Sequence, residues 1–236
     1  MTLPTKLLLI SSSAVYGTGY LDHAESEIRE TMGDAQRVIF IPYALADRVA
    51  YARKAIARFA GMGFQCKSID EYANPVTALA EADAIFVGGG NTFRLLKVLH
   101  ELGLVDAIRR RVEQGMIYMG ASAGSNVACP TIRTTNDMPI VEPPTLRALN
   151  LFPWQINPHY MDAEPGSRYM GETREQRLLQ FLEENPGPVI GLREGAILSV
   201  KDRRVYLTGL KGARIFSRDH SPEERTPPGE IEIHWQ

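Results

Sequence analysis

The sequence has few cysteines, no excess of charge of either sign and no long apolar run. Cys66 and Cys129 are its only cysteines and form no C-x-x-C pair, so we expect neither a disulfide framework nor a zinc ribbon. Two unpaired thiols are typical of a reducing compartment, and we expect a cytoplasmic protein. The net charge of −2, from 26 basic and 28 acidic side chains, argues against nucleic-acid and membrane partners. The first apolar run, residues 7–10, is too short for a membrane-spanning helix or a signal peptide.

What the chain does contain is an alternation of short apolar segments and longer segments of helical periodicity. Expected strands cover residues 6–12, 37–42, 64–69, 84–87 and 116–120, and expected helices cover 21–32, 48–62, 92–102 and 104–114. This alternation predicts βαβ units, and therefore an α/β three-layer sandwich with a mainly parallel central sheet flanked by helices. At about 150 residues per domain, we expect one domain spanning residues 1–236.

The second half of the chain is less regular. A long loop is expected over residues 129–144, a helix over 173–185 and a strand over 188–192. Short strands over 196–216 predict a small antiparallel layer near the C-terminus. A charged, proline-rich tail is expected over 221–229.

Residues 120–124, with the sequence G-A-S-A-G, form the strongest local motif. They follow an expected strand and precede a short helical segment, which is the context of the G-x-S-x-G nucleophile elbow. Glycines flank the serine because a sharp turn leaves little room for Cβ atoms. The motif makes Ser122 a candidate nucleophile and the Ala123 N–H a candidate oxyanion donor. The alternative is a turn of small residues without a catalytic role.

A run of three glycines, Gly88 to Gly90, follows the preceding expected strand. It lacks the spacing of a dinucleotide-binding loop or a P-loop, but its N–H groups can hold a negatively charged oxygen. Because ligands bind at the carboxyl ends of parallel strands, we expect Gly89 and Gly90 to supply the second half of an oxyanion hole. The alternative is a tight turn without a ligand.

A catalytic serine needs a base, and His159 is the strongest candidate among the five histidines. It ends a strand-like segment directly after Pro158, whereas the other four lie in polar segments. A carboxylate must then orient the imidazole. Two candidates stay open: Glu194, in a glycine-flanked turn after a buried strand, and Asp137, in the long expected loop. The chain order Ser, His, Glu differs from that of α/β-hydrolases, in which the acid precedes the histidine.

Several segments together resemble the peptidase E family of α-aspartyl dipeptidases, serine peptidases with a class I glutamine amidotransferase-like fold. The segments are GGGNTF (88–93), GASAGSN (120–126), ACPTIRTTNDMPIV (128–141), LFPWQINPHY (151–160), GETREQR (171–177) and GLREG (191–195). The resemblance extends over almost the whole chain. Gly90 and Ala123 match the oxyanion-hole positions of the family. Ala121 stands where an aromatic residue is expected and Arg193 where proline is frequent.

The resemblance also implies catalytic roles. It makes Ser122 the nucleophile of a serine-type dipeptidase, His159 the general base and Glu194 the triad acid. Asp137 matches a further aspartate proposed for the site. The Arg193 cation beside Glu194 leaves the role of that acid open, so Glu194 and Asp137 both remain candidates.

The substrate that the resemblance implies is a dipeptide or short peptide with an N-terminal aspartate. An arginine fork suits the aspartyl carboxylate, and Arg174, at the start of an expected helix, is the first candidate. Glu172 or Asp137 would meet the α-ammonium group, and Asn91 is a further candidate contact. We expect no metal, since no His, Cys or carboxylate cluster has ligand spacing, and no other cofactor. The protein is expected to be a monomer or a homodimer.

Two other functions remain possible on the same fold. A cyanophycinase-like hydrolase would cleave β-aspartyl-arginine units and would share the serine elbow. A non-catalytic binding protein would retain the fold and leave Ser122 unreactive towards serine-directed reagents.

Overall fold

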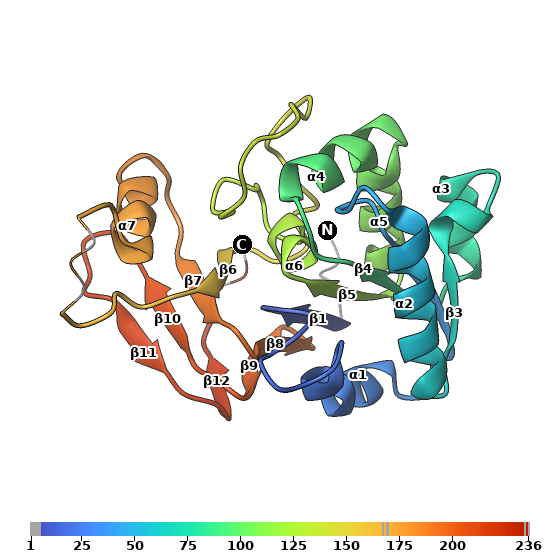
Figure 1. Ribbon diagram of the computed structural model, residues 1–236, viewed down its shortest axis with the longest axis horizontal. Coiled ribbons are helices and arrows are strands. Elements are labelled where there is room, and N and C mark those ends of the chain that lie inside the picture. Colours follow the sequence, from blue (N-terminus) through green and yellow to red (C-terminus); the bar gives the residue numbers. More distant parts are fainter. Residues whose placement is uncertain (1–5, 167, 169, 234, 236) are drawn as a thin grey trace.

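The largest element of the structure is an eight-stranded sheet with the order β12-β9-β8-β1-β5-β4-β2-β3 (Figure 1). The computed structural model describes residues 6–166, 168, 170–233 and 235. The strands of this main sheet are β1 (Lys6–Ile10), β2 (Arg37–Ile41), β3 (Gln65–Ser68), β4 (Ala84–Val87), β5 (Ile117–Ala121), β8 (Ala196–Lys201), β9 (Arg204–Gly209) and β12 (Gly229–Ile231). The first five run parallel, and β8, β9 and β12 continue the sheet antiparallel. The α/β fold with a large sheet flanked by helices is thus confirmed, and the sheet is mixed.

Helices cover both faces of the main sheet. One layer consists of α1 (Glu25–Met32) and α2 (Arg48–Gly61), and the other of α3 (Pro75–Ala78), α4 (Thr92–Glu101), α5 (Leu104–Glu113) and α6 (Ala123–Val127). In β1, Leu8 and Ile10 pack with the first layer, whereas Leu7 and Leu9 pack with the second. Both sets are fully buried, because successive side chains of a strand point to opposite faces. Burial on both faces explains why β1, β2, β4 and β5 contain continuous apolar runs, whereas the edge strand β3 is polar and largely exposed.

Short 3₁₀ helices occur beside the regular elements. They are η1 (Asp22–Ala24), η2 (Ile69–Glu71) and η3 (Leu79–Glu81). The helix expected over residues 21–32 is therefore divided into η1 and α1. The sequence pattern assigned no element between β3 and β4. In the structure, this connection contains η2, α3 and η3.

A second, four-stranded sheet lies beside the main sheet, to the left in Figure 1. Its strands, in the order β11-β10-β7-β6, are β6 (Gln155–Tyr160), β7 (Val189–Arg193), β10 (Ala213–Phe216) and β11 (Glu223–Arg225). β6 and β7 are parallel, while β7, β10 and β11 are antiparallel. Helix α7 (Arg174–Glu184) packs Leu178 and Leu182 against Tyr160 and Phe216 of this sheet.

The C-terminal strands are divided differently from the sequence expectation. The segment 196–216 does not form one layer: β8 and β9 extend the main sheet, and β10 belongs to the second sheet. The expected tail over 221–229 contains β11 and the start of β12. β11 and β12 lie at the edges of their sheets. Edge strands tolerate charged side chains, so the composition of this segment is similar to that of an irregular tail.

The long loop expected after Ser122 is present between α6 and β6. In the described residues, its regular pairing is limited to a bridge between Thr131 and Arg147. Several of its buried polar groups bind β6: the Asn157 side chain donates to the Thr134 carbonyl at 2.8 Å, and the Thr134 hydroxyl donates to the Ile156 carbonyl at 2.9 Å. The loop is therefore held at the edge where the two sheets meet. No described helix has the length and apolar character needed to cross a membrane.

Candidate active site

The G-A-S-A-G motif forms a sharp turn between β5 and α6. Ser122 has φ 53° and ψ −110°, a backbone conformation that is strained for a residue with a side chain. Its N–H donates to the Ile10 carbonyl of β1 at 2.9 Å. A Cβ atom on Gly120 would lie 2.5 Å from the Gly124 carbonyl oxygen, and one on Gly124 would lie 2.1 Å from the Val87 oxygen. Both glycines are therefore required for α6 to approach the sheet, and the turn presents the Ser122 hydroxyl at the sheet edge.

A chain of hydrogen bonds joins Ser122 to His159 and Glu194. The Ser122 Oγ lies 2.8 Å from His159 Nε2, and His159 Nδ1 lies 2.8 Å from Glu194 Oε1. Ser122 follows a strand of the main sheet, whereas His159 and Glu194 come from the ends of β6 and β7 in the second sheet. The site is thus assembled between the two sheets. The Glu194 side chain is 56% exposed, so solvent reaches the acid end of this chain.

Two serines at the end of β1 hold the loops that carry His159 and Glu194. The Ser11 hydroxyl accepts from the His159 N–H at 3.0 Å and donates to the Leu192 carbonyl at 2.7 Å. The Ser12 hydroxyl accepts from the Gly195 N–H at 3.3 Å. His159 itself has φ 53° and sits at an irregularity in the pairing of β6 with β7. No sequence motif pointed to these two serines, although their position directly after an expected strand was an available signal.

The glycine turn after β4 packs directly against the serine elbow. A Cβ atom on Gly89 would lie 3.0 Å from the Ser122 Cβ. Gly90 has φ 134°, and a Cβ there would lie 2.6 Å from the Ala44 carbonyl oxygen. Within the described part of the chain, the N–H groups of Gly90 and Ala123 have no hydrogen-bond acceptor. Gly90 lines the same cavity as Ser122, and Ala123 follows it in the chain, so these unpaired backbone donors are candidates to bind an oxyanion.

Asp137 lies in the same cavity as Ser122 and His159, but it does not bind the imidazole. Its Oδ2 accepts from the Thr92 N–H at 2.7 Å, from the Thr92 hydroxyl at 2.6 Å and from the Thr135 hydroxyl at 3.2 Å. The carboxylate therefore sits at the N-terminus of α4, where the helix dipole favours negative charge. Of the two acids that the sequence left open, the structure pairs Glu194 with His159.

The Asn91 side chain links α4 to the long loop. Its Oδ1 accepts from the Arg94 N–H at 3.0 Å and caps the helix, and its Nδ2 donates to the Met138 carbonyl at 2.9 Å. These bonds position the loop segment that contains Asp137. They leave one N–H and one lone pair of the Asn91 amide without a partner among the described residues.

Arg174 and Glu172 flank the start of α7, and only one of them has a free charge. Glu172 Oε1 accepts from Gln180 Nε2 at 2.8 Å, and its Oε2 lies 3.6 Å from Arg177 Nε. Arg174 is partly buried and forms no hydrogen bond or ion pair with any other described residue. Burial lowers the pKa of Arg174, and the Arg177 charge acts in the same direction, while Asp137 raises it. Arg174 is thus an unpaired cation within electrostatic range of Asp137.

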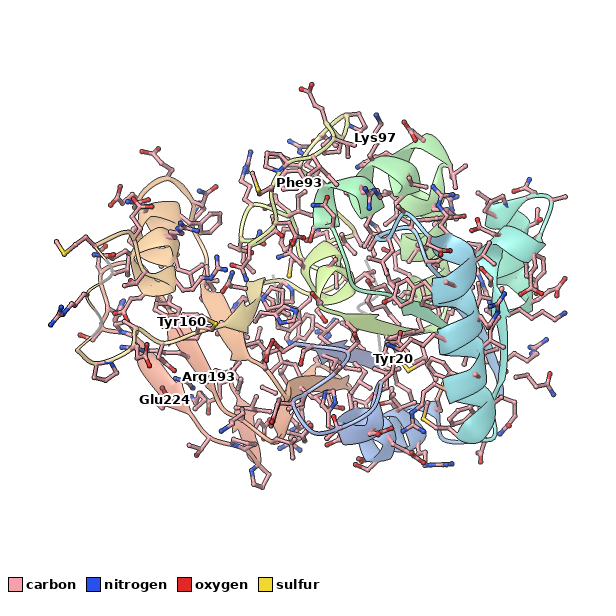
Figure 2. All side chains as sticks on the ribbon, in the orientation of Figure 1. Tyr20, Phe93, Lys97, Tyr160, Arg193 and Glu224 are labelled. Atoms are coloured by element: carbon pink, nitrogen blue, oxygen red, sulfur yellow. The ribbon has the colours of Figure 1, made fainter. Side chains whose placement is uncertain are left out.

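Arg193, the residue before Glu194, points to a different set of partners (Figure 2). Its guanidinium binds Asp162 through two hydrogen bonds of 2.7 and 2.9 Å, and it also binds Glu224. It lies 5.8 Å from the centroid of the Tyr160 ring. The bonds to Asp162 and Glu224 raise the pKa of Arg193. The positive charge of Arg193, which left the role of Glu194 open in the sequence, is therefore balanced by the carboxylates of Asp162 and Glu224.

A cavity of about 730 Å³ opens beside Ser122. One side contains Ser122, His159, Asp137 and the glycine turn. Its remaining lining includes the segment 12–14, Tyr20 and the α2 residues Tyr51 and Lys54, none of which the sequence patterns indicated. Among the described residues, no group of three His, Cys, Asp or Glu side chains is placed to hold a metal ion.

Comparisons with known proteins find similar peptidases. The model of the family described as "Peptidase family S51" matches residues 7–208. Peptidase E of Streptomyces coelicolor is 50% identical over 218 residues, which cover 92% of this chain and 90% of that protein. A "probable alpha-aspartyl dipeptidase" of Drosophila melanogaster is 44% identical over 234 residues, 98% of each chain. The crystal structure of a peptidase from an acI-B1 actinobacterium has a TM-score of 0.72 at 17% identity and covers 98% of both chains, which shows a shared fold.

Proposed function

The chain belongs to peptidase family S51, and on that premise we propose that it is a serine-type exopeptidase that removes N-terminal aspartate from dipeptides and short peptides. The observation that carries the proposal is the hydrogen-bonded series Ser122, His159 and Glu194. The names of its relatives, peptidase E and alpha-aspartyl dipeptidase, support the same substrate class. The matches do not favour a cyanophycinase-like or a non-catalytic protein.

In the proposed reaction, the Ser122 hydroxyl attacks the carbonyl carbon of the N-terminal aspartyl residue while His159 Nε2 takes its proton. Glu194, bound to Nδ1, holds the imidazole in orientation and stabilises its charged form. The oxyanion of the tetrahedral intermediate accepts from the N–H groups of Gly90 and Ala123. His159 then protonates the leaving amine, and an acyl-enzyme on Ser122 remains. Water, deprotonated by His159, attacks the ester and releases aspartate.

Recognition of the aspartyl residue is proposed to involve opposite charges at two positions. Arg174 pairs with the side-chain carboxylate, because it is partly buried, has no carboxylate partner among the described residues and lies within electrostatic range of Asp137. Asp137 meets the α-ammonium group: its Oδ2 is occupied by Thr92 and Thr135, which fixes the carboxylate while Oδ1 stays available. Glu172 is a weaker candidate for this role, because Gln180 and Arg177 already occupy its oxygens.

A cytoplasmic location is also proposed. Cys66 and Cys129 are both free, and burial raises the pKa of the Cys66 thiol to about 12. Protonated, unpaired thiols are compatible with a reducing compartment.

The proposal is tested with a panel of peptides and a serine-directed probe. Asp-Leu, Asn-Leu, Glu-Leu, Ala-Leu and β-Asp-Arg are incubated separately with the purified protein, and kcat/KM is measured for each. We expect rapid cleavage of Asp-Leu only, together with covalent labelling of Ser122 by a fluorophosphonate. Preferential cleavage of β-Asp-Arg would identify a cyanophycinase-like enzyme. Neither cleavage nor labelling would identify a binding protein.

A further inference from the structure

An aspartyl dipeptide carries one charge for which the proposed site has no partner. Its side-chain carboxylate and its α-ammonium group are matched by Arg174 and Asp137. Its C-terminal carboxylate lies on the other side of the scissile bond, in the leaving residue. Transfer of a carboxylate from water into the protein costs free energy unless a cation or hydrogen-bond donors bind it there. A complementary group on the leaving-residue side would therefore favour dipeptides over longer chains.

The cavity contains one cation on α2, whereas Arg174 lies on α7 and is not among the residues that line the cavity. Of its described lining residues, Lys54 is the one lysine or arginine. The Lys54 Nζ lies 4.5 Å from the centroid of the Tyr20 ring, and it has no carboxylate within ion-pair distance among the described residues. Asp47, also in the lining, uses its Oδ1 to cap α2 at the Ala50 N–H. Asp47 and Lys54 are seven positions apart, which places them about 10 Å apart along the helix axis.

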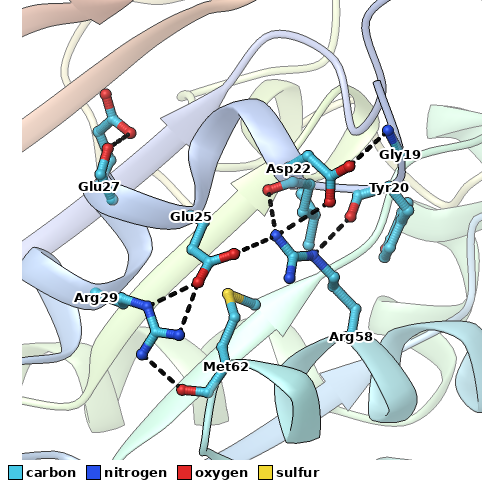
Figure 3. Close-up of polar contacts among 10 residues, drawn as sticks. Gly19, Tyr20, Asp22, Glu25, Glu27, Arg29, Arg58 and Met62 are labelled. Carbon is cyan, nitrogen blue, oxygen red and sulfur yellow. Dashed lines mark hydrogen bonds and ion pairs between the residues drawn. The ribbon is translucent and has the colours of Figure 1, made fainter. Parts of the chain in front are cut away.

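The wall that carries Lys54 is held in place by a polar network (Figure 3). Arg58, one turn further along α2, donates through Nε to the Tyr20 carbonyl at 2.9 Å and through an amino group to Glu25 at 2.7 Å. The same guanidinium lies 3.2 Å from Asp22. Tyr20 is therefore attached to α2 at its backbone, while its ring faces Lys54. A cation above an aromatic ring is held in a preferred position without being neutralised.

The same wall is in contact with the glycine turn beside Ser122. The rings of Tyr20 and Tyr51 are 6.3 Å apart in an edge-to-face arrangement. A Cβ atom on Gly88 would lie 2.5 Å from the Tyr51 hydroxyl, so this hydroxyl packs against the turn. The cavity thus continues from Ser122 past Gly89 to Tyr51, Tyr20 and Lys54. This part of the cavity has room for the leaving residue of a peptide whose aspartyl carbonyl group lies at Ser122.

We propose that Lys54 is a specificity-determining residue that binds the C-terminal carboxylate of the dipeptide, with Tyr20 and Tyr51 forming the wall of this leaving-residue subsite. The inference rests on the proposed function, because it assumes cleavage after an N-terminal aspartate. Lys54 extends from an exposed helix face into the cavity, so its contact with the carboxylate is partly solvated. Such a contact contributes less than a buried ion pair and more than a neutral hydrogen bond.

The test compares Asp-Leu with Asp-Leu-amide, which lacks only the terminal negative charge. Wild-type protein is expected to have a higher kcat/KM for the free acid. Lys54→Met keeps the length of the side chain over Tyr20 and removes the charge. It should lower the ratio of the two kcat/KM values about five- to tenfold, through a higher KM for Asp-Leu. Lys54→Arg should restore most of the ratio.

Lys67→Met is the matched control, because Lys67 Nζ also lies over a tyrosine ring, 5.8 Å from the centroid of Tyr72, outside the lining of this cavity. The ratio of kcat/KM for Asp-Leu to kcat/KM for Asp-Leu-amide should be the same in Lys67→Met as in the wild type. An unchanged ratio in Lys54→Met, or equal losses on both substrates, would overturn the inference and leave the proposed function intact. If the wild type had the same kcat/KM for Asp-Leu and for Asp-Leu-amide, the inference would also be overturned and the proposed function would stand. If the wild type cleaves neither substrate, the proposed function is wrong and the inference fails with it.

Discussion

The two sheets contribute to the candidate site in different ways. The main sheet supplies Ser122 and the glycine turn, whose arrangement depends on backbone geometry: positive φ angles and approaches that exclude a Cβ atom. The second sheet and α7 supply His159, Glu194 and Arg174, which act through charge and side-chain hydrogen bonds. Glu194 is half-exposed, whereas Ala121 and Ala123 around Ser122 are buried. The main-sheet half therefore depends on close backbone packing, and the second-sheet half depends on charges and side-chain hydrogen bonds, of which the Glu194 end is reached by solvent.

Within the second half, Arg193 and Arg174 show how a structural cation differs from one that is available to a ligand. Arg193 has two carboxylate partners, and these bonds raise its pKa. Arg174 has none among the described residues, and burial lowers its pKa. A partly buried cation without a partner is unfavourable for the free protein, and an incoming carboxylate removes that penalty. This difference makes Arg174 the better candidate for substrate recognition.

The largest expected effect is that of Ser122→Ala in the main-sheet half. The variant should fold normally, because alanine is smaller and the Ser122 hydroxyl is not the cap of α6. Loss of a triad serine lowers kcat by about 10⁶ in the best-studied case. We expect kcat for Asp-Leu to fall to the detection limit with an unchanged melting temperature. Ser26→Ala, at an exposed serine of α1, is the control. More than about a hundredth of wild-type activity would contradict the assignment.

The next largest effect is expected for Arg174→Ala in the charge-based half. A site that pairs with a substrate group can discriminate against analogues lacking it by about 10⁴. The ratio of kcat/KM for Asp-Leu to that for Asn-Leu should collapse in Arg174→Ala and be partly retained in Arg174→Lys, which keeps the charge and loses the fork.

Arg193→Ala sharpens the contrast between the two arginines. It should lower the melting temperature, because Asp162 and Glu224 lose their cation, while the Asp-Leu to Asn-Leu ratio stays at the wild-type value. If Arg193→Ala changed the ratio and Arg174→Ala did not, the assignment of the two cations would be reversed.

A smaller effect is expected from Glu194→Gln, and it separates the two candidate acids. The amide cannot stabilise the imidazolium ion, and a triad acid-to-amide change costs up to about 10⁴ in kcat. Since Glu194 is half-exposed, we expect a loss of about 10²–10³ in kcat with little change in KM. Asp137→Asn should mainly raise KM, because this acid is proposed to meet the α-ammonium group. Equal and small effects in both variants would indicate that His159 acts without a carboxylate partner.

The smallest of these effects concerns Ser11, which connects the two halves. Ser11→Ala removes the hydroxyl that joins the His159 N–H to the Leu192 carbonyl. We expect kcat to fall about tenfold and the free energy of unfolding to fall by about 1–2 kcal/mol, as for other buried hydrogen bonds. Ser199→Ala, at a buried serine of β8, is the control for loss of a buried hydroxyl elsewhere. Unchanged kcat in Ser11→Ala would show that β6 positions His159 without help from β1.

Much of the fold and several site positions could be predicted from local patterns. The apolar runs located the parallel strands, because residues buried on both faces of a sheet leave a continuous signal. The G-A-S-A-G motif located the turn at Ser122, since Gly120 is required by contacts within the turn itself, whereas Gly124 is required by its approach to Val87 of β4. Ser11, Tyr51 and Lys54 were not found, because a serine after a strand or a lysine on a helix is compatible with many surroundings. Their positions in the cavity depend on contacts with distant segments.

Local patterns therefore account for the α/β elements, the serine elbow and the strand-end positions of His159 and Glu194, because periodicity and turn chemistry act over a few residues. The tertiary structure was needed to establish that β6, β7 and β10 form a separate sheet and that the tail supplies two edge strands. It also decided that Glu194 rather than Asp137 binds His159 and that Arg193 is paired while Arg174 is not. These outcomes rest on hydrogen bonds and ion pairs between remote residues, such as the bond between Ser11 and His159, 148 positions apart. No local pattern encodes them, because each partner alone is satisfied equally well by water.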